Sequence, residues 1–410
     1  MFLTAYVAPD WIHICVDSGT GKVRWREALA LEKVERGSGL GSPAAPTAVT
    51  DGRRVVFYSG PFGLLARDYS GKELWRCPLP PPVTQHGVGS SPVVASGKVF
   101  LLRDQDLDSE LIALDLEDGR ILWRAPRPDF RRGFATPMVL GDGSDGQILV
   151  SGTLRAVAYR QGDGQEAWSV SGLPNELCPT PVTGAGLVFI TGWTSGSGVS
   201  RMPEFSALLA AGDLDKDGRL SREEAPAGPA RHHFPYIDAD KDGYLTREEY
   251  ESIASIFGRS QNALMAVRPG GVGDVTGTNV VWKFTRGLPY VPSPVYYRDR
   301  LFMVKNGGLA TCLNATNGVA SYQEERLGVV GDFYASPVAG NGRVLMISQP
   351  GVAVVLAASD QLEVLGTNPL GSTVLATPAL VGGRLLIRTA THLLAFAESG
   401  TKPEAGASSK

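Results

Sequence analysis

Two acidic segments contain the residues with the clearest chemistry in this sequence. Residues 213–218 read Asp-Leu-Asp-Lys-Asp-Gly and residues 238–243 read Asp-Ala-Asp-Lys-Asp-Gly, and a glutamate follows six positions after each glycine. Calcium is a hard cation that takes about six to eight oxygen ligands, so alternating carboxylates, a backbone carbonyl and a bidentate glutamate suit it. The glycine permits the sharp turn that such a loop needs. The spacing therefore predicts two calcium ions.

Both segments resemble the calcium loop of the EF-hand family, in which ligands come from the first, third, fifth, seventh, ninth and twelfth positions. Leu220 and Leu245 lie at the eighth position, where paired EF-hand loops join by a short β contact. A solvated acidic surface is the alternative, but it does not explain two full ligand sets. The predicted ligands are Asp213, Asp215, Asp217, the Arg219 carbonyl, Ser221 through water and Glu224, and then Asp238, Asp240, Asp242, the Tyr244 carbonyl, Thr246 through water and Glu249.

The pair of loops is expected to stabilise the structure or to buffer calcium rather than to act as a sensor. The loops start 25 residues apart, and Pro226 stands two residues after Glu224, where it cuts short the helix that leaves the first loop. A wide hinge-like opening is therefore not expected. The adjacent His232 and His233 point to different faces of a helix, which favours surface or packing roles over a transition-metal site.

Two short signatures recur along the rest of the chain. One is Ser or Thr followed by Pro and an apolar residue, with Ala45-Pro46-Thr47 as a weaker member. Successive prolines are 41 to 46 residues apart, except for one step of 113 residues. The other signature is a glycine four residues before a tryptophan, and it weakens towards the C-terminal end. The prolines are Pro92, Pro137, Pro181, Pro294, Pro337 and Pro378, and the glycines are Gly21, Gly71, Gly119 and Gly164.

Short alternating apolar runs between the signatures, such as Gly97–Leu102 and Leu111–Asp115, predict about four strands in each unit. A sheet of four short strands cannot bury both faces alone, so successive units must stack, and radial stacking produces a β-propeller. The tryptophan is expected to fill the space between neighbouring sheets. An irregular β-sandwich is the alternative, which the regular period disfavours. The predicted fold is therefore all-β, a propeller with a small α-helical insertion.

The repeat resembles that of the pyrroloquinoline-quinone-like, or quinoprotein-type, β-propeller family. Ser/Thr-Pro-Val, an Ala-Leu-Asp-like strand and Asp-Gly before a tryptophan recur, and Leu111–Asp115 with Gly119 and Trp123 matches this repeat closely. The family includes quinone-dependent dehydrogenases and a scaffold lipoprotein of outer-membrane β-barrel assembly. The fold implied by the resemblance therefore leaves the function open.

Eight repeat units can be counted, the first without its Ser/Thr-Pro strand and the last without its glycine and tryptophan strand. Seven blades with a spare hairpin is the alternative count. The 113-residue step contains the insertion, which we expect at the edge of the propeller, away from its axis. We divide the chain into a first part of the propeller at 1–195, an inserted EF-hand pair at 196–262, a second part of the propeller at 263–398 and a disordered tail at 399–410.

Residues just before each Ser/Thr-Pro strand are expected to gather around one mouth of the propeller axis, because the blades are related by rotation. Their charges and aromatic rings suit a polar small molecule or a peptide of a partner protein, with ordinary turn residues as the alternative. No nucleophile and base can be paired from the spacing, so no catalytic residue is assigned. The candidates are His86, Arg131, Glu176, Tyr290, Asp332 and Tyr334, with Gln85, Arg132, Asn175 and Arg286 beside them.

The resemblance also allows a test of the dehydrogenase branch, whose members pair their quinone with a vicinal disulfide, a stacking tryptophan and an axial calcium ion. No two cysteines are adjacent in this sequence, so pyrroloquinoline quinone is not expected as a cofactor and an enzyme is not favoured. The sequence favours a calcium-binding propeller that acts as a binding or scaffold protein, with a quinone-dependent oxidoreductase as the alternative. The four cysteines are Cys15, Cys77, Cys178 and Cys312.

Composition and charge limit the classes of partner and the cellular location that we expect. Lys and Arg number 39 against 42 Asp and Glu, a net charge of −3, which gives no reason to expect nucleic acid or an anionic membrane as partner. No apolar stretch approaches the ~18 residues of a membrane-spanning helix. Residues 1–7 read as a strand without a signal peptide, so we expect a truncated N-terminus. Weak EF-hand sites would fill in millimolar calcium, which favours an extracytoplasmic location in the periplasm or cell envelope.

Overall fold

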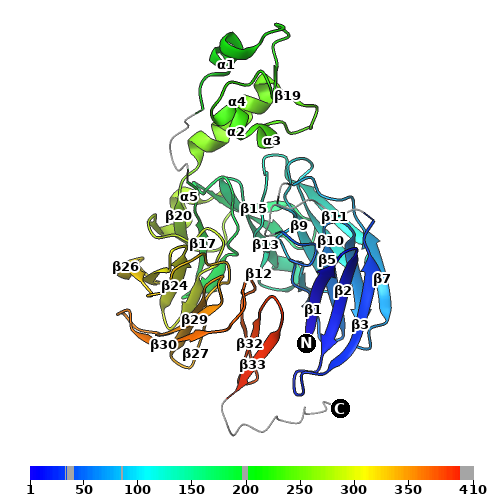
Figure 1. The fold of residues 1–410 in the computed structure, drawn as a ribbon, viewed down its shortest axis with the longest axis vertical. Helices are drawn as coiled ribbons and strands as arrows, with labels where there is room; N and C mark the ends of the chain where they lie inside the picture. The colour runs from blue at the N-terminus through cyan, green and yellow to red at the C-terminus, as the bar shows by residue number, and fades with distance from the viewer. Residues whose placement is uncertain (33, 35–40, 85, 196–201, 398–410) are drawn as a thin grey trace.

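The computed structural model describes residues 1–32, 34, 41–84, 86–195 and 202–397. In these residues eight sheets, antiparallel except for one short strand, form the blades of a propeller, and four of the helices lie together beyond one end of it (Figure 1). The strands of the first four blades are β1 (Phe2–Val7), β2 (Asp10–Val16) and β3 (Val23–Ala30); β4 (Val49–Thr50), β5 (Arg54–Ser59), β6 (Gly63–Asp68) and β7 (Glu73–Pro78); β8 (Val93–Ala95), β9 (Lys98–Arg103), β10 (Glu110–Asp115) and β11 (Ile121–Pro126); and β12 (Met138–Leu140), β13 (Gln147–Gly152), β14 (Arg155–Arg160) and β15 (Glu166–Ser171).

The other four blades repeat this order, but the fifth is interrupted by the insertion. The short strand β21 (Gly273–Asp274) pairs in parallel with the outer strand of the fourth blade, and the short helix α5 (Thr276–Asn279) follows it. The strands of these blades are β16 (Val182–Gly184), β17 (Leu187–Gly192), β20 (Ala263–Val267) and β22 (Val280–Phe284); β23 (Val295–Tyr297), β24 (Arg300–Lys305), β25 (Leu309–Asn314) and β26 (Ala320–Arg326); β27 (Val338–Gly340), β28 (Arg343–Ile347), β29 (Val352–Ala357) and β30 (Val364–Pro369); and β31 (Ala379–Val381), β32 (Arg384–Arg388) and β33 (Leu393–Ala397).

The prediction of eight blades is confirmed, as are the two incomplete terminal sheets. The first and last sheets have three strands each, and the six between them have four or five. The guanidinium of Arg384 in the last blade donates to the Ser18 carbonyl in the first, so the two terminal blades touch. The alternative of seven blades with a spare hairpin is therefore wrong.

The Ser/Thr-Pro signature joins neighbouring blades by hydrogen bonds. At six of the seven prolines, the backbone N–H of the residue before or after the proline donates to the corresponding hydroxyl of the next blade, and the bond lengths run from 2.9 to 3.3 Å. The short strands that follow these residues contact one another from blade to blade, which places them nearest the axis. The donor and acceptor pairs are Thr47 to Ser91, Ser91 to Thr136, Thr136 to Thr180, Thr180 to Ser293, Ser293 to Ser336 and Ser336 to Thr377.

The tryptophan of the second signature also contacts the next blade. The indole of Trp75 donates to the Leu116 carbonyl of the next blade at 3.0 Å and packs on the turn at Gly119. Trp25, Trp123 and Trp282 repeat this arrangement at Gly71, Gly164 and Gly318. Apolar clusters fill seven of the junctions between blades. The tryptophan therefore packs between sheets, as predicted.

The insertion leaves the propeller between two hydrogen-bonded strands. Gly192 ends β17 opposite Ala263, which begins β20, so the sheet closes directly behind the inserted residues. We call α1–α4 with β18 and β19 the EF-hand module. Its apolar core is distinct from the cores of the blades, and Leu154 of the fourth blade packs against it. Its elements are α1 (Phe205–Gly212), β18 (Leu220–Ser221), α2 (Pro229–His232), α3 (Phe234–Ile237), β19 (Tyr244–Leu245) and α4 (Arg247–Arg259).

The division of the chain at 196, 262 and 398 stays a prediction. The expected start of the insertion, 196–201, and the tail expected at 399–410 lie outside the described residues. No helix in the described part of the chain is long and apolar enough to cross a membrane.

Gly119→Ala tests the packing of tryptophan between the blades. A Cβ at Gly119 would lie 2.4 Å from the ring of Trp75, whereas a Cβ at Gly97 would meet nothing within 4 Å. Both glycines have a left-handed backbone, with φ of +74° and +71°, so both variants share that cost of roughly 1–2 kcal/mol. We expect Gly119→Ala to lower the free energy of unfolding by about 1–3 kcal/mol more than Gly97→Ala. Equal losses in urea denaturation would contradict the packing.

Candidate functional site: the EF-hand module on the propeller mouth

The first calcium loop gathers three of its predicted carboxylate ligands. Oxygens of Asp213, Asp215 and Glu224 lie within 4.8 Å of one another. Glu224 accepts hydrogen bonds from the backbone N–H of Ser221 at 2.9 Å and from its hydroxyl at 2.8 Å, and these bonds hold the pKa of Glu224 below its usual value. Asp217 is turned instead towards Arg219, with which it forms an ion pair at 2.9 Å.

The second loop gathers a different set of three. Oxygens of Asp238, Asp240 and Asp242 lie within 4.8 Å of one another. Glu249 caps the start of α4: it accepts from the backbone N–H of Thr246 at 3.0 Å and from its hydroxyl at 2.7 Å. The second Glu249 oxygen accepts from the backbone N–H of Ala239 at 3.0 Å, so this glutamate faces the loop.

The two loops are paired through the strands predicted for them. Leu220 lies opposite Leu245 in the β18–β19 pair, and both side chains are fully buried. The fourth position of each loop, Lys216 and Lys241, has a left-handed φ of 62°. The two loops thus have matching backbones as well as matching sequences.

Unpaired buried oxygens show that the loops suit a cation. Asp213 Oδ1 and Asp238 Oδ1 are buried and have no hydrogen-bond partner in the described structure. A buried carboxylate oxygen without a partner is costly, and burial raises the pKa of Asp238 accordingly. A calcium ion among these carboxylates would remove that cost, because it prefers oxygen ligands and neutralises their charge.

The EF-hand module lies over one end of the propeller axis, which we call the mouth. Arg131 of the propeller donates to the Tyr236 carbonyl of α3 at 2.8 Å, and the Arg132 guanidinium stands 4.1 Å from the centre of the Tyr236 ring. Arg132 also forms a buried ion pair with Asp106 at 2.6 Å. Figure 1 shows the module at this end of the propeller. The prediction that the insertion lies at the edge, away from the axis, is therefore wrong.

One residue of the second calcium loop reaches the propeller directly. Lys241 places its Nζ 3.4 Å from the Asp106 carboxylate, and it donates to the carbonyls of Pro235 at 2.5 Å and Asp238 at 2.7 Å. Asp238 is the first residue of that loop. The Lys241 ammonium group therefore bridges the second calcium loop and the mouth.

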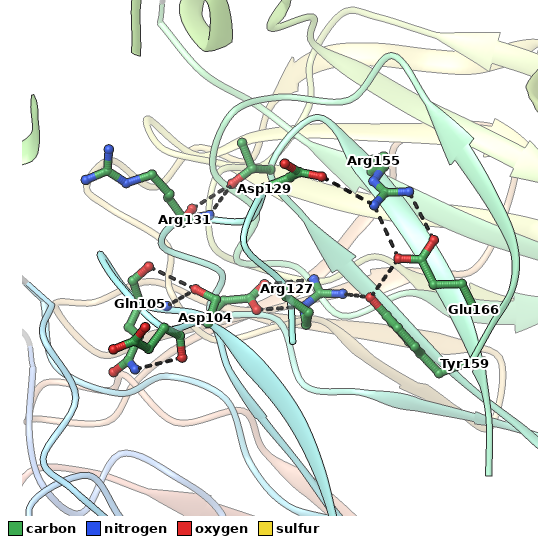
Figure 2. Close-up of polar contacts among 11 residues, drawn as sticks. Asp104, Gln105, Arg127, Asp129, Arg131, Arg155, Tyr159 and Glu166 are labelled. Carbon is green, nitrogen blue, oxygen red and sulfur yellow. Dashed lines mark hydrogen bonds and ion pairs between the residues drawn. The ribbon is translucent and has the colours of Figure 1, made fainter. Parts of the chain in front are cut away.

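A buried ion pair holds the segment that presents Arg131 and Arg132. We call residues 127–135 the mouth loop. Its first residue, Arg127, is fully buried and bidentate to Asp104 at 2.7 and 2.9 Å, as Figure 2 shows. The same guanidinium donates to the Tyr159 hydroxyl and stacks 3.6 Å from the centre of the Phe130 ring.

The far side of the mouth loop is fixed by backbone contacts. The Arg131 N–H donates to the Thr153 hydroxyl at 2.9 Å, and that hydroxyl donates back to the Arg131 carbonyl at 2.7 Å. With its base held by the Arg127 pair, the loop holds its two arginines in fixed positions against the EF-hand module.

Between the module and the mouth lies a cavity of about 610 Å³, which we call the mouth cavity. Among the predicted mouth residues, His86, Glu176 and Tyr290 line it, and so do Arg132 and Asn175. The module contributes residues from α2 to α4, including His232, His233, Tyr236 and Phe257. This volume lies within the ~300–1,000 Å³ usual for small-molecule sites.

The remaining predicted mouth residues lie elsewhere. Arg131 contacts the EF-hand module and does not line the mouth cavity. Asp332, Tyr334 and Arg286 do not line the cavity either. The Tyr334 hydroxyl is 3.5 Å from the Asp332 carboxylate, so these two contact each other. Gln85 lies outside the described residues.

Sequence reasoning missed Trp193 and Tyr236. Trp193 follows β17 directly, and its ring centre lies 6.0 Å from that of Tyr290 in an edge-on arrangement. No glycine stands four residues before Trp193, so it does not belong to the repeat signature. This was the only feature of the sequence that could have marked Trp193 as a functional residue. Nothing in the sequence marks Tyr236 as the residue that faces the propeller, because the insertion's orientation arises only on docking.

Comparisons with known proteins agree with this architecture. Residues 10–192 match the family model described as outer membrane protein assembly factor BamB, and residues 205–224 and 233–254 match the EF-hand model. The chain is a β-propeller that carries an inserted EF-hand pair. No curated protein matches it in sequence.

Two solved structures illustrate the fold of this propeller. BamB from Moraxella catarrhalis aligns with a TM-score of 0.58 at 12% identity, over 96% of this chain and 94% of that chain. The computationally designed protein Ika8 aligns with a TM-score of 0.55 at 10% identity, over 97% of this chain and 96% of that chain. At these identities the likeness concerns the fold alone.

Arg127→Met tests the buried pair beneath the mouth loop. Removing one partner leaves the Asp104 carboxylate buried without a counter-ion, so the free energy of unfolding should fall by about 3–5 kcal/mol. Replacing both partners, as in Arg127→Met with Asp104→Leu, should recover part of this loss. The control is Arg155→Met, whose ion pair with Glu166 is partly exposed and should contribute less than about 1 kcal/mol. Similar urea midpoints for the two single variants would contradict this role.

Proposed function

We propose that this protein is a calcium-stabilised binding or scaffold propeller, in which the EF-hand pair holds the mouth in its binding form. The observation that carries the proposal is the docking of the second calcium loop on the mouth through Lys241 and Asp106. A loop that carried calcium at the edge of the propeller would have no such contact.

Calcium binding and docking are linked through the same few residues. Asp238 and Asp240 are predicted ligands of the second ion, and Lys241 follows them directly in the chain. When a cation orders the loop, it also fixes the Lys241 backbone and its route to Asp106. A ligand that binds only the folded module stabilises it by mass action.

The fold of the EF-hand module supports a structural role for the calcium. The segment after the first loop forms turns up to α2 rather than a long exiting helix, in keeping with Pro226. Phe205, Ile237 and Tyr250 are buried in one core with the two paired leucines, which a wide opening would expose. We therefore propose ions that stay bound rather than a switch that opens.

The binding or scaffold role is proposed by likeness. The matching family model is named after an outer-membrane assembly factor. That name describes the proteins of the family, and we carry the role over to this chain only as a proposal. We propose an extracytoplasmic location, where millimolar calcium fills weak EF-hand sites. Nothing in the comparisons favours the alternative of a quinone-dependent oxidoreductase.

Calcium titration tests the metal sites. We expect calorimetry to detect two ions per chain and saturating calcium to raise the melting temperature, because a ligand at about 100 times its Kd stabilises by roughly 2.7 kcal/mol per site. Glu224→Gln with Glu249→Gln should abolish both effects. Glu248→Gln is the matched control, since Glu248 is exposed at the neighbouring loop position. Full calcium binding by the double variant would count against these ligands.

Lys241→Ala tests the coupling between the second loop and the mouth. In the wild type we expect calcium to slow amide hydrogen exchange in the mouth loop, because the ordered module covers it. Lys241→Ala should bind calcium yet lose most of this protection. Lys216→Ala is the control, because Lys216 occupies the same position and backbone conformation in the first loop and is exposed. If both variants behave alike, the bridge does not couple the two parts.

A further inference from the structure

We propose that the mouth cavity binds an organic cation, the ammonium or guanidinium group of a small molecule or of a basic side chain. The inference rests on the proposed role of the mouth as a binding site, and it adds the chemical class of the ligand. Three residues of the propeller carry it: Glu176, Trp193 and Tyr290.

The charges that line the cavity favour a positive ligand. Arg132 is the one Arg or Lys among the described lining residues, and it is already paired with the buried Asp106 carboxylate, which Lys241 shares, and stacked on Tyr236. Glu176 is the one carboxylate among them, and it forms no ion pair with any described residue. A cation that enters the cavity therefore meets a carboxylate without a counter-ion.

The contacts of Glu176 leave it free to accept more hydrogen bonds. Its Oε1 accepts from the Tyr290 hydroxyl, while a carboxylate has about four lone-pair sites. Burial and the neighbouring Glu176 raise the pKa of Tyr290 well above its usual value, so the phenol remains a neutral donor. Burial likewise lowers the pKa of His233, which disfavours the charged form of this ring.

Aromatic faces complete a site for a cation. Trp193 and Tyr290 are each 37% exposed although both are large, and their rings meet at 74°. Cations are attracted to the faces of such rings, and Trp is the strongest of them. Tyr236 already shows the chemistry in this cavity, because its ring receives Arg132 at 4.1 Å.

The site is held in place before a ligand arrives. The Asn175 N–H donates to the Ser260 hydroxyl at 3.0 Å, and that hydroxyl donates to the Asn175 side chain at 3.0 Å. Leu177 on the other side of Glu176 is fully buried, and its carbonyl accepts from the Phe134 N–H at 3.0 Å. Next to Trp193, the Thr194 N–H donates to Asn262 at 2.6 Å. These anchors limit the entropy lost on binding.

The test is calorimetric titration of the calcium-loaded full chain with two cationic probes and one neutral probe. The cations are agmatine and the blocked tripeptide Gly-Arg-Gly, and the neutral probe is the same tripeptide with citrulline in place of arginine. We expect saturable binding of at least one cation and none of the citrulline peptide. Glu176→Gln and Trp193→Leu should each weaken binding about tenfold or more. Glu363→Gln, at an exposed site in the seventh blade, should leave it unchanged.

The outcomes separate the source of the cation and the two proposals. Tighter binding of agmatine indicates a small molecule, and tighter binding of the arginine peptide indicates a polypeptide partner. No saturable binding of either cation into the millimolar range, equal binding of the citrulline peptide, or unchanged affinity in Glu176→Gln would overturn the inference. The calcium-dependent rise in melting temperature, measured for every variant, shows whether the module remains intact. Its loss in the wild type would instead contradict the proposed function.

Discussion

Every blade of this propeller depends on its neighbour to satisfy its polar groups. At six of the seven signature prolines a neighbouring N–H finds its acceptor in the next blade, and so does the indole N–H of Trp25, Trp75, Trp123 and Trp282. A buried donor without an acceptor costs free energy, so these bonds fix the angle and height at which sheets meet. The apolar clusters between the blades then fill the remaining space.

Among the tryptophans that follow a signature glycine, Trp168 is the exception. Trp168 donates to the side chain of Gln147 in its own blade at 2.8 Å instead of to the next blade. The strand β21, which the fifth blade adds after the insertion, pairs with β15 at this tryptophan. The connection between β20 and β22 in the fifth blade therefore adds a strand to the fourth blade at this junction.

Ion pairing separates the charged side chains at the mouth that hold the structure from the one that remains available to a ligand. Arg127 and Arg132 are buried, and each is paired with an aspartate and packed on an aromatic ring. Unpaired buried charge is costly, so such pairs hold a segment in one position rather than bind passing ions. Glu176 differs because it accepts a hydrogen bond from a phenol and borders an open cavity. The mouth therefore has paired arginines that hold its structure and, in Glu176, one carboxylate without a counter-ion.

Sequence alone was sufficient for the features that repeat or that depend on neighbours in the chain. The 41 to 46-residue period predicted eight four-stranded units, since a regular repeat must form equivalent sheets. The two loop sequences predicted their own turns and the Leu220–Leu245 pairing, because calcium loops are local structures. Tertiary structure decided where the EF-hand module lies, because its orientation depends on contacts between Tyr236, Lys241 and side chains more than 100 residues away. The same long-range contacts assemble the mouth cavity, which no local pattern encodes.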